Sequence, residues 1–133
     1  MTEPARLLIL AHDGSWEKRF QVTSLATSEA ASGQPVDLAL FFAALHCWVE
    51  DDWDRLDPSP PLDADTVERL GLPSPMSLLK ESRDEGNLRI YACSASVRLL
   101  DLDPAATQSR VDAILGWQSF SRMIRKASQV ATF

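Results

Sequence analysis

One cysteine stands where a strand-like run gives way to a helix-like run. In RIYACSASVRLLDLD, residues 89–103, the apolar run ends at Cys93, and small residues including Ser94 and Ser96 follow it. A thiol at such a junction lies near the free backbone N–H groups of the next helix, which favour the thiolate, the reactive form in sulfur chemistry. Arg98, one turn further on, adds a positive charge. Two roles fit this pattern: a reactive thiol, or a small buried hydrophobic residue, as free cysteines often are.

Other residues could support chemistry at the same place. His12 ends the first apolar run and could hold a thiolate or act as an acid, although a surface histidine is the commoner case. Cys47 could act as a resolving thiol, although a core-facing cysteine is commoner. Ser94 and Ser96 could donate hydrogen bonds to a bound sulfur or anion, or simply start a helix. Together with Cys93 and Arg98, these residues form the candidate site.

Metal and nucleotide chemistry find little support. Cys47 and Cys93 form no CxxC motif, and the two histidines, His12 and His46, have no ligand spacing, so no zinc site is expected. The HDGS segment after the first apolar run has one glycine and no GxGxxG pattern, so it is a weak candidate for a loop that binds phosphate or flavin. A flavin or nucleotide protein remains a third, minor alternative.

The length and charge of the chain narrow the class of protein. With 133 residues, the chain is expected to form a single domain, residues 1–133, with a substantial core. The net charge is −6, but residues 50–68 alone hold eight acidic residues and one basic residue, Arg55. No basic face is evident, so nucleic acid is not an expected partner. The apolar run Leu7 to Ala11 is too short for a signal-peptide core or a membrane span, which predicts a cytoplasmic protein with no membrane partner.

Strand-like and helix-like segments alternate along the chain. Strands are expected at 6–12, 35–42, 87–93, 111–115 and 129–133. Helices are expected at 13–33, 76–86, 94–101 and 118–128, with a short one at 63–70 inside an acidic, proline-rich excursion, residues 51–75. This alternation predicts an α/β, flavodoxin-like three-layer sandwich around a mostly parallel five-stranded sheet. In such a sheet chemistry occurs beyond the carboxyl ends of the strands, where Cys93 and His12 are expected.

Two segments carry a resemblance to a known family. YACSASVRLLDLD, together with GWQSFSRMIRKASQVATF, resembles the DsrE/DsrF-like family of small sulfur-relay proteins, which includes the TusD type. The family's active-site segment is a strand, a cysteine, small residues and then a basic residue, and Cys93, Ala95 and Arg98 match it. The family also closes with a glycine, an amphipathic helix and a short strand ending in phenylalanine, as residues 116–133 do. The resemblance spans nearly all of the chain except residues 51–75.

This resemblance implies a persulfide carrier that needs no metal or organic cofactor. Cys93 would accept a sulfane sulfur, hold it as a persulfide and pass it to an acceptor thiol, so the partners would be thiol sulfur donor and acceptor proteins. Family members assemble as trimers, hexamers or complexes with sister subunits, which predicts a homo-oligomer or such a complex. Some members lack the cysteine. The alternative is therefore a non-enzymatic binding or assembly module whose cysteine is inert.

Overall fold

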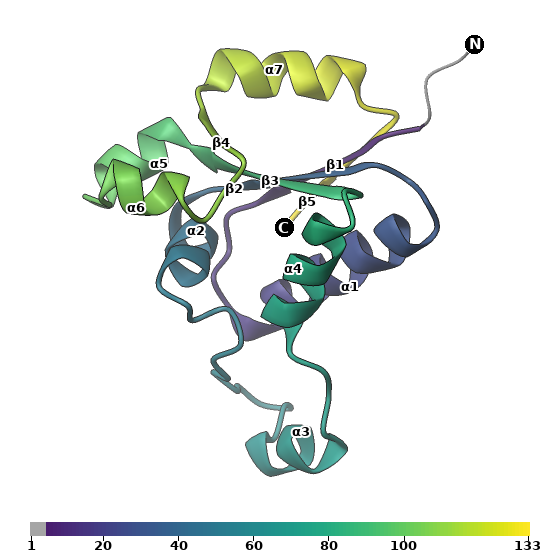
Figure 1. Ribbon diagram of the computed structural model, residues 1–133. Coiled ribbons are helices and arrows are strands. Elements are labelled where there is room, and N and C mark those ends of the chain that lie inside the picture. The colour runs from purple at the N-terminus through teal and green to yellow at the C-terminus, as the bar shows by residue number, and fades with distance from the viewer. Residues whose placement is uncertain (1–4) are drawn as a thin grey trace.

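A five-stranded parallel sheet with helices on both faces forms the centre of the protein (Figure 1). The structure is a computed structural model and describes residues 5–133. The strands are β1 (Leu7–Ala11), β2 (Val36–Leu40), β3 (Leu88–Cys93), β4 (Ala113–Leu115) and β5 (Gln129–Thr132). The helices are α1 (Trp16–Ala31), α2 (Phe42–Val49), α3 (Ala64–Leu70), α4 (Pro75–Asp84), α5 (Ser94–Leu99), α6 (Pro104–Gln108) and α7 (Trp117–Lys126). The predicted α/β, flavodoxin-like three-layer sandwich is confirmed.

The strand order is β4-β3-β2-β1-β5, and every neighbouring pair is parallel. The chain therefore steps outward from β1 to β4, and α7 then carries it back across the sheet to β5, on the far side of β1. The register places Ala11 beside Leu40 and Leu40 beside Ala92, so the carboxyl ends of β1, β2 and β3 reach the same edge of the sheet. The loops that follow these three strands consequently lie next to one another.

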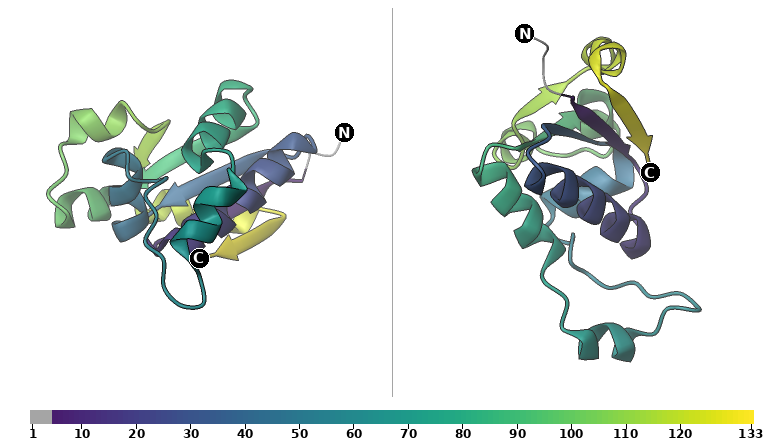
Figure 2. Two further views of the ribbon diagram at one scale, coloured as in Figure 1. Left: turned by 90° about the horizontal axis from the view of Figure 1, so that it is seen from below. Right: turned by 90° about the vertical axis from the view of Figure 1, so that its right-hand side faces the viewer.

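The two faces of the sheet are covered unequally. Alternate residues such as Ile9, Leu38 and Ile90 point into the main core, which also takes side chains from α1, α2, α4 and α5. The opposite face carries α7, and its buried cluster contains Ala39, Phe41, Cys93 and Phe120. Figure 2 shows α7 alone above the sheet and the larger helical layer below it. One face of the sheet is thus covered by α7, and the other by several helices.

The amphipathic pattern that predicted α7 is only partly buried. Phe120 is fully buried and Met123 half-buried, whereas Ile124 is exposed and Ala127 lies just beyond the helix. A surface helix normally turns its apolar stripe toward a core. Here the stripe is wider than the contact that α7 makes with the sheet, so Ile124 remains exposed.

Some element boundaries differ from those expected. The second strand ends at Leu40 rather than at residue 42, because α2 starts at Phe42. Helix α6 was not expected, although its start is recognisable: Pro104 is its first residue, and the Asp103 side chain accepts a hydrogen bond from the Ala106 N–H at 3.0 Å. The short helix expected at 63–70 is confirmed as α3, which projects away from the sheet (Figure 1).

Candidate functional site

Cys93 lies at the junction that its sequence context predicted. It is the last residue of β3 and the N-cap residue of α5, which begins at Ser94. Its neighbours along the sheet edge are Phe41, after β2, and Leu115, at the end of β4. The backbone around Cys93 therefore has the strand-to-helix geometry that brings thiols close to helical N–H groups.

The side chain of Cys93 is nevertheless buried, with 1% of its surface exposed. It packs in the small cluster under α7, against Phe41 and Phe120. The rings of Phe41, Trp117 and Phe120 lie within 5.1–5.7 Å of one another, measured between centroids, so three aromatic side chains cover this part of the sheet. A partner thiol has no direct access to the Cys93 sulfur in this arrangement.

The residues that follow Cys93 serve the fold. The Ser96 hydroxyl is buried and accepts a hydrogen bond from the Phe42 N–H at 3.1 Å, which ties α5 to the start of α2. Ser94 is half-buried and packs near Gly116. Arg98 is exposed on α5, a helix of six residues. Ser96 is thus already engaged within the protein, and Arg98 points to solvent.

His12 and Cys47 lie apart from Cys93. His12 is exposed after β1, and β2 separates β1 from β3, which places the backbones of His12 and Cys93 about 10 Å apart at the strand spacing of a sheet. Cys47 belongs to the main core, on the opposite face of the sheet, and its Sγ lies 3.8 Å from the Gly14 carbonyl oxygen. Burial raises the pKa of the Cys47 thiol. Both cysteines are free, and the fold does not bring them together as a thiol pair.

The HDGS loop is shaped by packing rather than by a phosphate site. The Asp13 carboxylate accepts a hydrogen bond from the Ser15 N–H at 2.8 Å, which lowers the pKa of Asp13, and the Ser15 side chain caps α1. A Cβ atom at Gly14 would lie 2.7 Å from the Cβ of Ala43 on α2, so glycine is needed for this close approach. The loop also faces the point where the strand order reverses, between β1 and β5, a common ligand crevice in open sheets.

The N-terminus of α1, which follows this loop, already holds a carboxylate of the protein itself. Asp57, in the excursion, accepts a hydrogen bond from the Trp16 N–H, at the start of α1, at 2.8 Å. The same Asp57 oxygen accepts a hydrogen bond from Arg19 Nη2 at 2.9 Å. The position where a helix N-terminus would bind a phosphate is therefore taken by Asp57.

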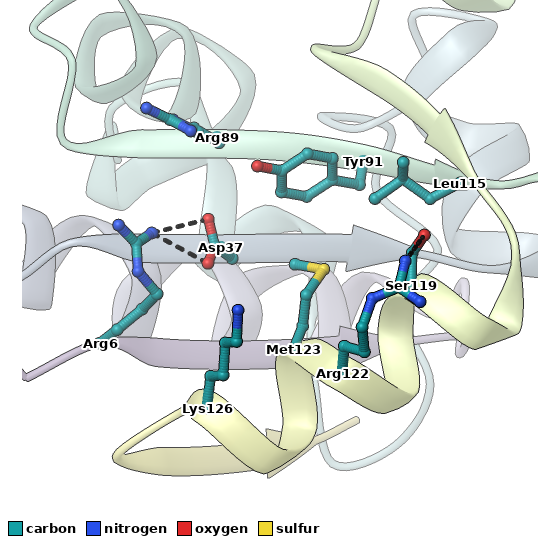
Figure 3. Close-up of a pocket in the computed structure, with 9 residues that line it drawn as sticks. All are labelled: Arg6, Asp37, Arg89, Tyr91, Leu115, Ser119, Arg122, Met123 and Lys126. Carbon is teal, nitrogen blue, oxygen red and sulfur yellow. Dashed lines mark hydrogen bonds and ion pairs between the residues drawn. The ribbon is translucent and has the colours of Figure 1, made fainter.

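An open groove lies on the sheet face beside α7. Its volume is about 690 Å³. Figure 3 shows that its side chains come from β2, β3, β4 and α7 and from the residue before β1. The lining residues are Arg6, Asp37, Arg89, Tyr91, Leu115, Ser119, Arg122, Met123 and Lys126. Four of them are cations and one is a carboxylate, in a chain whose net charge is −6.

Asp37 lines one end of this groove and forms an ion pair with Arg6. Its side chain is 7% exposed, and Arg6 Nη1 donates hydrogen bonds to both of its carboxylate oxygens, at 3.0 and 2.9 Å (Figure 3). Within residues 5–133, Arg89, Arg122 and Lys126 have no carboxylate within salt-bridge distance. The groove therefore carries positive charge that the described part of the chain leaves uncompensated.

Tyr91 and Met123 form an apolar wall within the groove. Burial raises the pKa of the Tyr91 hydroxyl, and the nearby Asp37 carboxylate adds to the effect. Tyr91 therefore remains neutral at physiological pH and offers both a ring face and a hydroxyl. The groove combines cations with a flat apolar surface.

Sequence reasoning overlooked this groove, although the sequence held signals for it. Asp37 is an acid inside an otherwise apolar strand, VDLAL, and a buried carboxylate needs a cationic partner. Arg89 and Tyr91 alternate with buried residues of β3, so they share the face of Cys93. The sequence does not show that α7 returns over this face of the sheet, because that return depends on the strand order.

Residues 5–133 contain neither a membrane-spanning helix nor a cluster of metal ligands. No helix within residues 5–133 is both long and apolar enough to cross a membrane. In the same part of the chain, no three His, Cys, Asp or Glu side chains are grouped so that they could hold a metal ion.

Comparisons with known proteins bear on the fold alone. No family model and no curated protein matches the chain. A solved structure, that of the protein of unknown function MTH1491 from Methanobacterium thermoautotrophicum, is similar with a TM-score of 0.59 and 12% sequence identity. The match covers 96% of this chain and 98% of that one. The two proteins thus share an α/β fold over their whole lengths.

Proposed function

We propose that the protein is a non-enzymatic, DsrE-like binding module whose groove beside α7 binds an anionic ligand, and in which Cys93 is a buried structural thiol. One observation supports the proposal above the others: four cationic side chains and a single carboxylate line the groove, in a chain of net charge −6. Cations gathered in a cleft raise the local concentration of anions and speed their association.

The side chains suit anion recognition in their chemistry. Arg89 and Arg122 carry guanidinium groups, which donate paired hydrogen bonds to carboxylate and phosphate oxygens. Lys126 adds a point charge from α7, while Tyr91 and Met123 can cover an apolar part of the same ligand. Arg6 is held in place by Asp37, so it loses little freedom on binding.

The test is a calorimetric titration of the protein with inorganic pyrophosphate, a multivalent anion that serves as the probe. We expect saturable binding by the wild type and at least about tenfold weaker binding by the double variant Arg122→Gln/Lys126→Gln, because charge-assisted hydrogen bonds are lost. Arg125→Gln is the matched control, since Arg125 lies on the same helix outside the groove lining. No saturable binding, or an equal loss in Arg125→Gln, would contradict the proposal.

A sulfur carrier is the second candidate, and one observation favours it. Cys93 ends β3 at the carboxyl edge of the sheet and is covered by a single helix, α7. In this hypothesis α7 moves away and the Cys93 thiolate attacks the outer sulfur of a donor persulfide, releasing the donor thiolate. An acceptor thiolate then attacks the terminal sulfur and releases Cys93. The partners are sulfur donor and acceptor proteins, in a homo-oligomer or with sister subunits.

Intact-protein mass spectrometry distinguishes the two candidates. The protein is incubated with a persulfide donor and compared with Cys93→Ser and Cys47→Ser. A carrier gains a sulfur atom that a reductant removes, in the wild type and in Cys47→Ser but not in Cys93→Ser. A binding module with an inert thiol gains none at Cys93 while folded.

A further inference from the structure

The excursion contains a projecting segment, of which Val67, Glu68 and Leu72 line a shallow cavity together with Trp16 and Phe20 of α1. We call residues 62–72, which comprise α3 and its two flanks, the acidic arm. None of the residues of α3 is buried, and the exposed fractions of Leu70 and Leu72 are 67% and 46%. Figures 1 and 2 show α3 at the end of the molecule away from α7. A seven-residue helix has little stability of its own, so contacts beyond those in a single copy would stabilise it.

The acids of the excursion fall into two groups. Those near its base work within the fold: Asp51 pairs with Arg110, Asp57 pairs with Arg19, and Asp54 accepts a hydrogen bond from the Met76 N–H. Those of the arm form no such ion pair, although Asp63 accepts a hydrogen bond from the Thr66 hydroxyl at 2.9 Å within the arm itself. Asp63, Asp65 and Glu68 are exposed, and within residues 5–133 none of them has a cationic side chain within salt-bridge distance.

The arm and the groove beside α7 are complementary. The arm carries three acids against one base, Arg69, and two exposed leucines. The groove carries four cations against one acid, with apolar contributions from Tyr91, Leu115 and Met123. The two surfaces lie on opposite sides of the molecule, so the arm cannot reach the groove of its own chain (Figure 1). Two grooves facing each other would place like charges together, which is unfavourable.

We propose that the acidic arm of one copy binds in the groove of a second copy, so that the ligand class of the groove is an acidic polypeptide segment of this same chain. The inference rests on the proposed anion-binding function of the groove. Because the arm and the groove are different surfaces, the contact is head-to-tail, and its repetition gives a ring if the rotation closes and an open chain if it does not. Arg122 and Lys126 contact Asp65 and Glu68, while Leu70 and Leu72 pack on the apolar wall.

The test uses two neutralised variants of the full chain. The arm variant is Asp65→Asn/Glu68→Gln, and the groove variant is Arg122→Gln/Lys126→Gln. We expect sedimentation velocity at low salt to show concentration-dependent association of the wild type, which high salt reverses. Each variant alone sediments as a monomer at concentrations at which the wild type associates, corresponding to at least about tenfold weaker self-association.

Mixing the variants gives the decisive measurement. The arm variant keeps an intact groove and the groove variant an intact arm, so an equimolar mixture retains one functional contact per pair. We expect a one-to-one complex that grows no further. Asp84→Asn/Glu85→Gln is the matched acidic control, because these exposed residues lie at the end of α4, away from the arm, and it should associate like the wild type.

Each other outcome is informative. A wild type that stays monomeric at low salt while binding pyrophosphate overturns the head-to-tail contact and leaves the anion-binding function standing. A monomer that binds no pyrophosphate overturns both. Association that survives in the arm variant, or that fails to reappear in the mixture, places the contact elsewhere and overturns the inference.

Discussion

Arg19 and Asp57 form an ion pair of 2.9 Å in which the arginine side chain is fully buried and the aspartate is 42% exposed. Arg19 also donates hydrogen bonds to the carbonyl oxygens of Gly14, Asp52 and Trp53. One side chain from α1 therefore ties the first loop of the fold to the start of the excursion. The pair therefore anchors the start of the acidic, proline-rich segment to α1.

Removing the Arg19 donors should destabilise the protein strongly. In Arg19→Met the apolar stem remains while three carbonyl groups and the Asp57 carboxylate each lose a hydrogen bond from the guanidinium, so we expect a loss of about 3 kcal/mol in the free energy of unfolding. Urea denaturation followed by tryptophan fluorescence measures it. Arg55→Met is the control, because Arg55 and Asp52 form an exposed pair whose loss should change stability by less than about 1 kcal/mol. Equal effects of the two substitutions would contradict this role of Arg19.

The cover over Cys93 should depend on Phe120. Phe120→Ala removes a fully buried ring from a small cluster, so we expect a loss of about 3 kcal/mol in stability and faster alkylation of Cys93 by iodoacetamide. Cys47 is an internal control, since it lies in the other core and should remain slow. Parallel acceleration of both thiols would indicate global unfolding rather than local opening. Ile124→Ala, an exposed position on the same helix, should leave both rates unchanged.

The stability of the fold should decline at alkaline pH. Burial raises the pKa of the Cys47 thiol above its ordinary value of 9.0, so the unfolded chain releases this proton at a lower pH than the folded chain does. The unfolded state therefore binds fewer protons above pH 9, and the free energy of unfolding falls as pH rises. Urea denaturation under reducing conditions across this range measures the slope. In Cys47→Ala the slope should be smaller, and an unchanged slope would assign it to other groups such as Tyr91.

Gly14 should tolerate no side chain. A Cβ atom there would lie 2.7 Å from the Cβ of Ala43 and 3.1 Å from its backbone atoms, so the first loop and α2 must separate in Gly14→Ala. We expect a loss of about 1–3 kcal/mol in the free energy of unfolding, the usual cost of overpacking. Thermal denaturation measures it, and Ala43→Gly in the same chain should restore part of the loss. A neutral Gly14→Ala would show that the loop can relax without cost.

Local patterns were sufficient to predict most elements of this fold, with α6 the exception. The unbroken apolar run at β1 indicates a strand buried on both faces, and the glycines at 33 and 86, both with a φ of 87°, end α1 and α4 as expected. The position of Cys93 between β3 and α5 was likewise predictable. All of these features depend on residues within a few positions of one another, because hydrogen bonding and side-chain periodicity in strands and helices are local.

The surroundings of each functional group were decided by tertiary structure. The order of the strands sends α7 back over the sheet, and this brings Phe120 onto Cys93 and Lys126 toward Arg89, pairs that are far apart in the sequence. The same order places Asp37 beside Arg6 and so shapes the groove. The order of residues along the chain thus specifies most of the strands and helices and which of their faces are apolar. Long-range packing decides which side chains cover Cys93 and which cations line the groove. A parallel sheet can bury the same strands in several orders, so local patterns do not fix these contacts.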